Sequence, residues 1–346
     1  MRKYLFILSI CFIAISCTDL NNEINSNNFQ MNEFTGRSVV FYNVENLFDT
    51  KHDPGKDDEQ FTPFGEYEWD DERYQKKLGR ISDALSFIQE KPVLVGLAEI
   101  ENYNVLNDLV KQDIFKNQSM GIIHFESPDR RGIDCALLYD KKVFKVIDSE
   151  NIPITLDYNP AFNTRDILYV KGEMMGGVIT HVFVNHWSSR REGKAETSHK
   201  RERAATILRA KIDEITAVDP KANILVLGDF NDHPDDRSLE KILKAKESGY
   251  ANDGDLINLF YDDNENDLGT SVYMNDWAVL DQIIVSQSIY DGSNKIGIEK
   301  RNGFILDNEE LLFTQRDGNK KPNSTYGGRR YYGGYSDHLP VYIILK

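Results

Sequence analysis

"ILVLGDFNDHPDD" (residues 224–236) decides the fold, because an apolar run ends there abruptly in carboxylate and amide side chains. A short apolar run bounded by turn residues is typical of a buried strand. The Asp, Asn and Pro residues that follow favour a turn, since they hydrogen-bond to their own backbone and tolerate tight bends. Asp229 and Asn231 lie two positions apart, which places both side chains on one side of an extended segment. The stretch therefore indicates either a simple turn or a pair of groups that faces a metal ion or a phosphate.

The same kind of junction recurs along the chain. Apolar residues that run together or alternate predict further strands over residues 38–48, 92–102, 132–140, 166–174, 178–187, 279–286 and 339–346. Polar side chains stand near the ends of these runs, namely Asn43, Glu45, Glu99, Asn185, His186, Asp281, Asp337 and His338. One such residue is usually no more than part of a turn. Because catalytic groups concentrate at strand ends, five junctions of this kind predict one shared site.

Length, composition and net charge limit which fold and which function the chain can have. The chain has 346 residues and is 40% hydrophobic, which is ample for a packed core. Apolar residues recur at helical spacing from Tyr74 to Ile88, and a second helix is predicted over residues 202–218. This alternation favours an α/β (α+β) fold with one domain over residues 37–346. The net charge of −15 excludes a protein that coats nucleic acid through bulk positive charge, but it leaves a local phosphate site open.

The N-terminus carries an export signal. Arg2 and Lys3 precede an apolar run that is too short to span a bilayer, and "IAISC" (13–17) is similar to a bacterial lipoprotein processing box. We predict a signal peptide over residues 1–16, lipidation of Cys17 and a flexible tether over residues 17–36. The protein would then be exported and anchored to a membrane, on its periplasmic side or at the cell surface. An ordinary secretory peptide cut near the same place is the alternative.

Cysteine use agrees with this reading. Cys11 lies in the predicted signal peptide and Cys17 would carry the lipid, which leaves Cys135 alone in the mature chain. Cys135 lies in the apolar run "GIDCALLY", so we expect a small buried side chain rather than a nucleophile.

Six segments together resemble the endonuclease/exonuclease/phosphatase superfamily, and in particular a secreted bacterial lipoprotein member. In the family's order they are "NVENLF" (43–48), "GLAEIEN" (96–102), "VNHWSSRREG" (184–193), "LGDFND" (227–232), "VLDQIIVS" (279–286) and "YSDHLPV" (335–341). The resemblance covers residues 38–346. It implies a deoxyribonuclease I-like fold, which is a four-layer sandwich of two mixed β-sheets flanked by helices. It also implies a divalent-metal-dependent phosphodiester hydrolase with its active site where the strand ends meet.

The resemblance also implies which residues hold the metal. Mg²⁺, or Mn²⁺ in its place, would be bound chiefly by Glu99 with the help of Asn43, and Asp337 would be a second ligand. Carboxylate oxygen is the donor that Mg²⁺ prefers, and one or two acidic ligands suffice. Strand alternation from Leu97 puts Glu99 and Glu101 on one face, so spacing alone leaves open which of the two binds the metal.

Catalytic roles follow in the same way. Asp229 would orient or deprotonate the attacking water, and Asn231 would hold that water or donate to the phosphate. Asp281 would fix and charge the His338 imidazole, which contacts the scissile phosphate. His186 would stabilise the transition state or protonate the leaving group.

Substrate contacts are expected from Asn185 and Arg191, which lie inside "VNHWSSRREG", and from Arg131, which lies in "RRGIDCALLYD" (130–140), a segment similar to those of secreted bacterial members. We predict an extracytoplasmic nuclease that acts on DNA or RNA. A phosphatase or phospholipase-like enzyme acting on inositol phosphates or sphingomyelin-type head groups is the alternative within catalysis, and an inactive surface-binding lipoprotein is the alternative outside it. The acidic stretch over residues 57–72 is expected to be a solvated loop, and no obligate protein partner is evident.

Overall fold

The computed structural model describes residues 36–265, 269–273, 275–299 and 303–346. The predicted signal peptide (1–16), Cys17 and the predicted tether up to residue 35 lie outside these ranges. Within the described ranges, no helix combines the length and the apolar character needed to cross a membrane.

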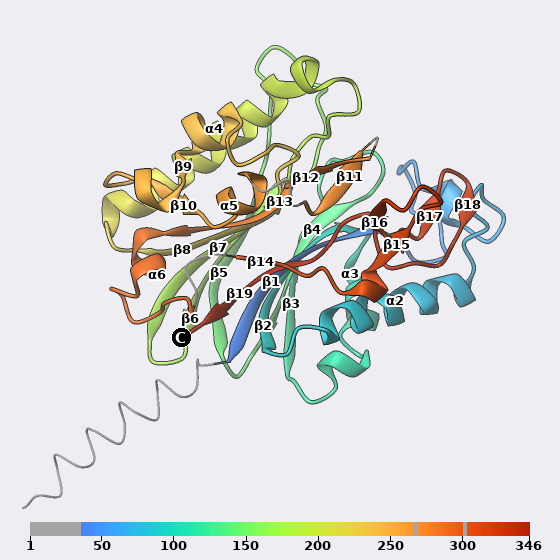
Figure 1. The fold of residues 1–346 in the computed structure, drawn as a ribbon, viewed down its shortest axis with the longest axis horizontal. Coiled ribbons are helices and arrows are strands. Elements are labelled where there is room, and N and C mark those ends of the chain that lie inside the picture. Colours follow the sequence, from blue (N-terminus) through green and yellow to red (C-terminus); the bar gives the residue numbers. More distant parts are fainter. Residues whose placement is uncertain (1–35, 266–268, 274, 300–302) are drawn as a thin grey trace, which may run out of the picture.

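Two mixed β-sheets pack face to face in the centre of the molecule (Figure 1). The six-stranded sheet has the order β14 (Phe304–Ile305), β19 (Val341–Leu345), β1 (Arg37–Leu47), β2 (Lys91–Ile100), β4 (Asp134–Asp140) and β3 (Met120–His124). The seven-stranded sheet has the order β5 (Phe144–Ile152), β6 (Ile167–Met174), β7 (Val178–His186), β8 (Asn223–Asp229), β13 (Asp281–Ser286), β10 (Leu256–Asn258) and β9 (Ala245–Lys246). β1 pairs with β2 in parallel, as β7 does with β8, so that two strands in each sheet end at the same edge.

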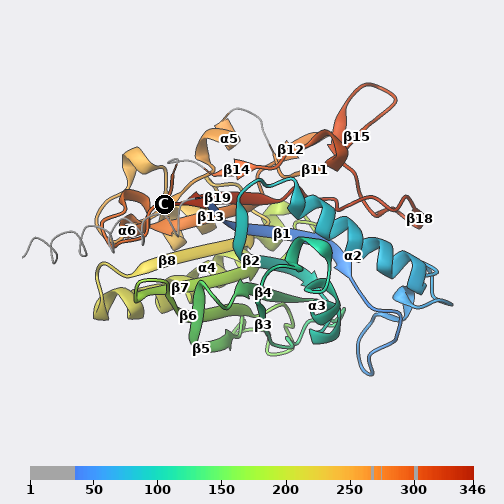
Figure 2. The ribbon, with the colours of Figure 1, turned by 90° about the horizontal axis from the view of Figure 1, so that it is seen from below.

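Helices cover the outer faces of both sheets and complete four layers (Figures 1 and 2). Helices α2 (Asp71–Ser86) and α3 (Tyr103–Leu109) pack on the six-stranded sheet, and α4 (Lys194–Val218) packs on the seven-stranded sheet. A third apolar cluster, which includes Phe41 and Leu227, fills the space between the sheets. The predicted fold, a sandwich of two mixed sheets flanked by helices, is confirmed.

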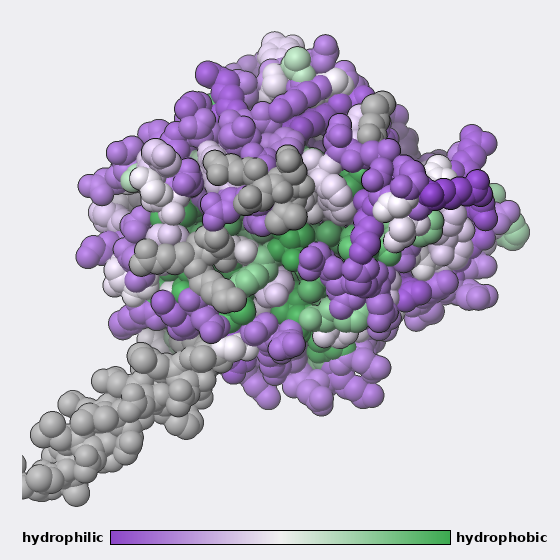
Figure 3. Space-filling view, in the orientation of Figure 1, coloured by the Kyte–Doolittle hydropathy of each residue, from purple (hydrophilic) through white to green (hydrophobic). Residues whose placement is uncertain are grey.

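The remaining elements are short. They are α5 (Tyr261–Glu265), α6 (Gln287–Asp291), a π-helix (Ser238–Leu243), single turns at Glu59–Phe61, Asp113–Phe115, Ser248–Tyr250 and Glu309–Leu311, and three hairpins, β11 (Ser271–Tyr273) with β12 (Asp276–Ala278), β15 (Leu312–Thr314) with β16 (Lys320–Pro322), and β17 (Tyr326–Gly327) with β18 (Arg330–Tyr331). Apolar side chains gather in a hollow on the face shown in Figure 3, where Trp277, Phe304 and Leu312 line a groove of about 400 Å³. None of the predicted site residues lines that groove.

One helix boundary and the burial of one loop differ from the sequence-based expectation. Helix α4 begins at Lys194, upstream of the predicted start at residue 202, because its polar first turns are held by side chains rather than by an apolar stripe. Arg201 in those turns is fully buried. Residues 57–72 have mostly exposed side chains, as predicted, but this stretch, which is a loop up to the start of α2, is not solvated throughout. Phe61 and Trp69 enter the core beneath α2, and Asp58 is buried as well.

Burial of His181 in the middle of β7 predicts a loss of stability in acid. Burial and the charge of Lys171 lower the pKa of His181 to about 4, and its Nδ1 lies 2.7 Å from the Tyr169 hydroxyl. The unfolded chain therefore binds this proton near pH 6.5 while the folded chain does not. Stability that is present above pH 6.5 should be lost as the pH falls toward 4, by about 1 to 3 kcal/mol. Urea unfolding at pH 7 and pH 4.5 should show a smaller loss for His181→Gln than for the wild type, and equal losses would contradict this assignment.

Candidate active site

Three of the predicted catalytic residues stand side by side at one edge of the seven-stranded sheet. In the β-ladder His186 pairs with Asp229, and Asp229 pairs with Asp281. Paired residues project from the same face of a sheet, so the three side chains form one row. Val184 and Leu227, two residues before His186 and Asp229, belong to the core between the sheets. The row therefore caps that core with polar groups at the strand ends, as the sequence predicts.

Glu99 reaches this row from the other sheet because β2 carries a bulge. The pairing of β2 with β4 shifts between Ala98 and Ile100, and Glu99 has a φ of 65°. A bulge changes the direction in which a side chain points, and the regular alternation of side chains along β2 is interrupted at this bulge. Glu99 Oε1 lies 3.9 Å from His186 Nε2, and its Oε2 accepts a hydrogen bond from the Asn46 backbone N–H.

The bulge also separates Glu99 from its neighbour Glu101. Glu101 accepts the Asp49 backbone N–H at 2.5 Å, and its carboxylate lies among those of Asp53 and Asp58 rather than at the row. Of the two glutamates, Glu99 is therefore the one that lies at the strand-end site.

Asn43 ties the two sheets together at the site. Its Nδ2 donates to Asp229 Oδ2 at 3.1 Å, while its Oδ1 accepts the Glu45 backbone N–H. Ser336 Oγ donates to the Asn43 carbonyl and accepts the His338 backbone N–H. Residues from β1, β8 and the segment before β19 are thereby fixed against one another.

His338 and Asp281 form a buried pair. The Nδ1 atom of His338 lies 2.6 Å from Asp281 Oδ2, and its Nε2 lies 4.0 Å from Asp229 Oδ2. Burial alone would lower the pKa of His338, but the carboxylates of Asp281 and Asp229 raise it well above its usual value. The site thus holds a positively charged imidazole even though the chain as a whole is acidic.

His186 and Asp229 titrate in the opposite sense. Burial and the charges of Arg165 and Arg131 hold the pKa of His186 well below its usual value, so this imidazole is neutral at pH 7. Burial raises the pKa of Asp229 to about 7, against the lowering effect of the His338 charge. A carboxyl group with a pKa near 7 can accept a proton from water at neutral pH, and a neutral imidazole can donate a hydrogen bond.

Asn231 lies in a turn and not in an extended strand, because β8 ends at Asp229 and Asn231 has a φ of 51°. Its backbone N–H donates to Asp229 Oδ1 at 3.0 Å, and its Nδ2 donates to the Trp187 carbonyl. The spacing argument for Asn231 is therefore wrong in its geometry. The backbone of Asn231 thus contacts Asp229, while its side-chain amide is held by the Trp187 carbonyl.

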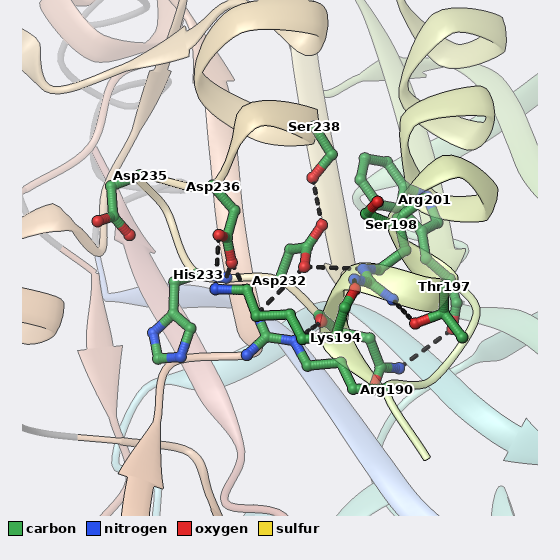
Figure 4. A network of polar contacts seen from close by, with 12 residues as sticks. Arg190, Lys194, Thr197, Ser198, Arg201, Asp232, His233, Asp235, Asp236 and Ser238 are labelled. Atoms are coloured by element: carbon green, nitrogen blue, oxygen red, sulfur yellow. Dashed lines mark hydrogen bonds and ion pairs between the residues drawn. The ribbon is translucent and has the colours of Figure 1, made fainter. Parts of the chain in front are cut away.

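An ion-pair network holds the turn that follows (Figure 4). Asp232 Oδ1 lies 2.7 Å from Arg201 Nε and 3.1 Å from an Arg190 nitrogen, while its Oδ2 accepts a hydrogen bond from Ser238. Arg190 also donates to Asp236 and to the Asn231 carbonyl. Arg190 therefore ties the start of α4 to the loop that carries Asn231, and this fixes the position of the strand end.

The structure does not bring all of the predicted residues together. Asn185 is fully buried. Its Nδ2 donates to the Leu227 carbonyl, and its Oδ1 accepts a hydrogen bond from the Trp187 indole N–H. Arg191 is exposed in the turn before α4. The side chain of Arg131 is partly exposed and its Nε lies 3.4 Å from Asp129 Oδ1, while its charge acts on His186. Asp337 is exposed, and its charge acts on His338 and Glu45.

Two groups of buried residues lie beside the site, and of their members only Glu45 was expected there from its place near a strand end. Arg165 is buried, pairs with Asp129 at 3.2 Å and donates to the Trp187 carbonyl. Glu45 accepts the backbone N–H groups of Thr325 and Tyr326, and burial raises its pKa to about 7.

Lys77 of α2 completes the second group. It is buried beside Glu45 and donates to the Thr325 hydroxyl and the Tyr335 carbonyl. An arginine before an apolar run and a lysine on a helix are ordinary surface features in a sequence. No local signal marks either of them as buried.

The residues at the strand ends fit a hard divalent cation. The Glu99 carboxylate is partly exposed, and among the described residues no Lys or Arg forms an ion pair with it. The His186 imidazole next to it is kept neutral, so this contact adds no positive charge at Glu99. Carboxylate and amide oxygens are the donors that Mg²⁺ and Mn²⁺ prefer. Glu99 and Asn43 are the residues that would hold the ion.

Comparisons with known proteins identify the family of the chain. The family model described as "Endonuclease/Exonuclease/phosphatase family" matches residues 38–346. The human Nocturnin catalytic domain with bound sulfate is similar in fold at 15% identity and a TM-score of 0.53, with 90% of this chain and 94% of that chain covered. A comparison with curated protein sequences finds no match.

Two further solved structures are similar. A mannosyl-6-phosphatase of Bacteroides thetaiotaomicron has 13% identity and a TM-score of 0.55, with 90% and 99% of the two chains covered. Danio rerio TDP2 in complex with a single-strand DNA product has 14% identity and a TM-score of 0.53, with 90% and 98% covered. At these identities the structures show a shared fold. The family model matches nearly the whole described chain, and the chain therefore belongs to the endonuclease/exonuclease/phosphatase family, whose members are metal-dependent phosphoester hydrolases.

Proposed function

We propose that this protein is a Mg²⁺- or Mn²⁺-dependent phosphodiesterase that cleaves DNA or RNA. The observation that carries the proposal is the in-register row of His186, Asp229 and Asp281, with His338 charged by Asp281 and Glu99 facing the row. One edge thus offers a proton acceptor, a cationic imidazole, a neutral imidazole and a place for a cation. Phosphoester hydrolysis needs a positioned water, positive charge against the phosphate and stabilisation of the leaving oxygen, which these groups can supply.

Asp229 is the proposed base. Asn231 N–H binds its Oδ1 and Asn43 Nδ2 binds its Oδ2, so the carboxyl group is held in one orientation. It would take a proton from the attacking water. When bound at Glu99 and Asn43, the divalent cation supplies positive charge against the phosphate oxygens.

The two imidazoles are proposed to act on the phosphate in different ways. His338 carries a proton because Asp281 stabilises its charge, and it would hold a non-bridging oxygen of the phosphate. His186 is neutral and would donate a hydrogen bond toward the leaving oxygen. Arg131 is partly exposed and could bind a neighbouring phosphate of a nucleic acid, a contact that a phosphomonoester does not offer.

A substrate panel tests the choice of nucleic acid. We expect the purified chain with Mn²⁺ to cleave plasmid DNA or RNA faster than it releases phosphate from inositol phosphates or mannose 6-phosphate, or phosphocholine from sphingomyelin. Cleavage of closed circular plasmid would indicate endonuclease action. Hydrolysis of the phosphomonoesters or of sphingomyelin alone would overturn the nuclease assignment in favour of a phosphatase or a phospholipase-like enzyme.

We also propose that the enzyme acts outside the cytoplasm as a lipoprotein anchored through Cys17. The basis is the sequence of residues 1–17, with its basic start, apolar run and processing box. Cys17→Ser should release the protein from the membrane fraction. Unchanged partitioning of that variant would contradict a lipid anchor.

A further inference from the structure

Four carboxylates converge beside the active site, and none of the three that lie closest together pairs with a Lys or Arg among the described residues. Ligand oxygens of Asp53, Asp58 and Glu101 lie within 4.8 Å of one another, and Asp49 is close enough for its charge to act on Glu101. Among the described residues, no Lys or Arg forms an ion pair with Asp53, Asp58 or Glu101. The single imidazole in contact with them is that of His52, which bonds to Asp58.

Glu101 supplies the observation that points to a ligand. It is 2% exposed, and its Oε2 accepts the Asp49 N–H, but its Oε1 is buried without a hydrogen-bond partner. Buried carboxylate oxygens almost always have a partner, because an unsatisfied one costs about 1 to 3 kcal/mol or more.

The neighbouring loop is built to keep these groups in place. Asp58 is 1% exposed and accepts the Asp53 N–H on its Oδ2. The Trp69 indole donates to the Phe48 carbonyl, one residue before Asp49. The segment that connects β1 to α2 is thus anchored at Phe48 and Asp58, and it presents its acids toward the end of β2 next to Glu99.

We propose that Asp53, Asp58 and Glu101 form a second cation site, separate from the strand-end site, and that it takes Ca²⁺. Three carboxylates make a hard, oxygen-only donor set, and Ca²⁺ accepts such ligands in flexible geometry at about 2.3 to 2.6 Å. Oxygens up to 4.8 Å apart can therefore share one Ca²⁺, whereas Mg²⁺ requires about 2.1 Å and a near-ideal octahedron. The ion would satisfy Glu101 Oε1, offset the clustered charge and fasten residues 49–71 to β2.

Calorimetric titration of Ca²⁺ into chelator-treated full-length protein tests the site. The titration is made on a Glu99→Gln background, so that ion binding at the strand ends is removed. We expect one equivalent of Ca²⁺ to bind and to raise the melting temperature. Asp53→Asn and Glu101→Gln, each added to that background, should weaken binding at least ten-fold and abolish the rise.

Asp57→Asn is the matched control on the same background, because Asp57 lies in the same loop but is exposed and pairs with Arg130. It should bind Ca²⁺ as tightly as the background protein. Absence of binding in the Glu99→Gln protein, unchanged affinity in the two ligand variants, or tighter binding of Mg²⁺ than of Ca²⁺ would overturn the proposal. If Glu101→Gln does not fold, Asp53→Asn decides, since the Asp53 side chain is partly exposed.

Discussion

His338→Ala is expected to lower kcat by about 10³-fold or more while the protein stays folded. The substitution removes the cationic imidazole whose Nε2 lies 4.0 Å from Asp229 Oδ2, and it leaves the Asp281 carboxylate without its partner. Loss of one group that stabilises transition-state charge in a buried site costs about 10² to 10³ in rate, and loss of a general acid costs a similar factor. Initial rates on a DNA or RNA substrate at saturating Mn²⁺ measure the effect.

Asp281→Asn removes the negative charge next to His338 while it keeps the size and shape of the side chain. The amide retains a hydrogen-bond acceptor for His338 Nδ1 but no longer stabilises the imidazolium, so the pKa of His338 should fall and activity should be retained best at acid pH. His233→Ala serves as the control, because His233 lies outside the cluster and bonds to Asn264. It should retain activity within about two-fold. A His338→Ala protein that turns over at the wild-type rate would refute the proposed role of this pair.

Glu99→Gln is expected to lower kcat/KM by about 10³-fold and to raise the Mn²⁺ concentration needed for half-maximal rate. The amide keeps the size of the side chain and one oxygen that can accept the Asn46 N–H, but it loses the negative charge that would hold the cation. A metal titration of the initial rate separates weak ion binding from a defect in the chemical step.

The control for this substitution is Glu214→Gln, an exposed change on α4, which should leave the metal titration unchanged. If Glu99→Gln retained wild-type metal dependence, the cation would have to be bound elsewhere. Glu45 and Asp337, which lie close together beside the site, would then be the first residues to test.

The sequence predicts the strand-end row well for a physical reason. Apolar runs mark buried strands, and parallel neighbours such as β7 and β8 end at the same edge, so polar residues that close those runs must meet. His186 and Asp229, 43 positions apart in the chain, are paired in register for that reason.

Glu99 could not be distinguished from Glu101 in the same way. The strand alternates until a bulge at Glu99 shifts the register, and nothing in "GLAEIEN" identifies that bulge. The buried positions of Arg165, Lys77 and Asp58 were equally hidden, since each is buried by contacts with segments far away in the chain. Lys77, for example, reaches Thr325 from α2.

The polar stretch that connects β1 to α2 shows the limit of composition as a guide. Its acids suggest a solvated loop, but Phe61 stacks on Phe48 with ring centroids 4.2 Å apart and Trp69 packs edge-on against Phe61. Tertiary packing of these aromatic rings outweighs local polarity. The acids beside them are therefore held in place, which is what allows the second cation site to be proposed.

The central claim is that the strand-end row hydrolyses phosphodiesters with the help of a divalent cation. The most direct measurement is the initial rate of the purified chain on a defined DNA or RNA substrate with Mn²⁺, after addition of excess chelator, and after Mn²⁺ is restored. The account predicts a rate with Mn²⁺ that chelation abolishes and that Mn²⁺ restores in the wild type but not in His338→Ala. A rate that persists unchanged in chelator, or that His338→Ala shares in full, would contradict it.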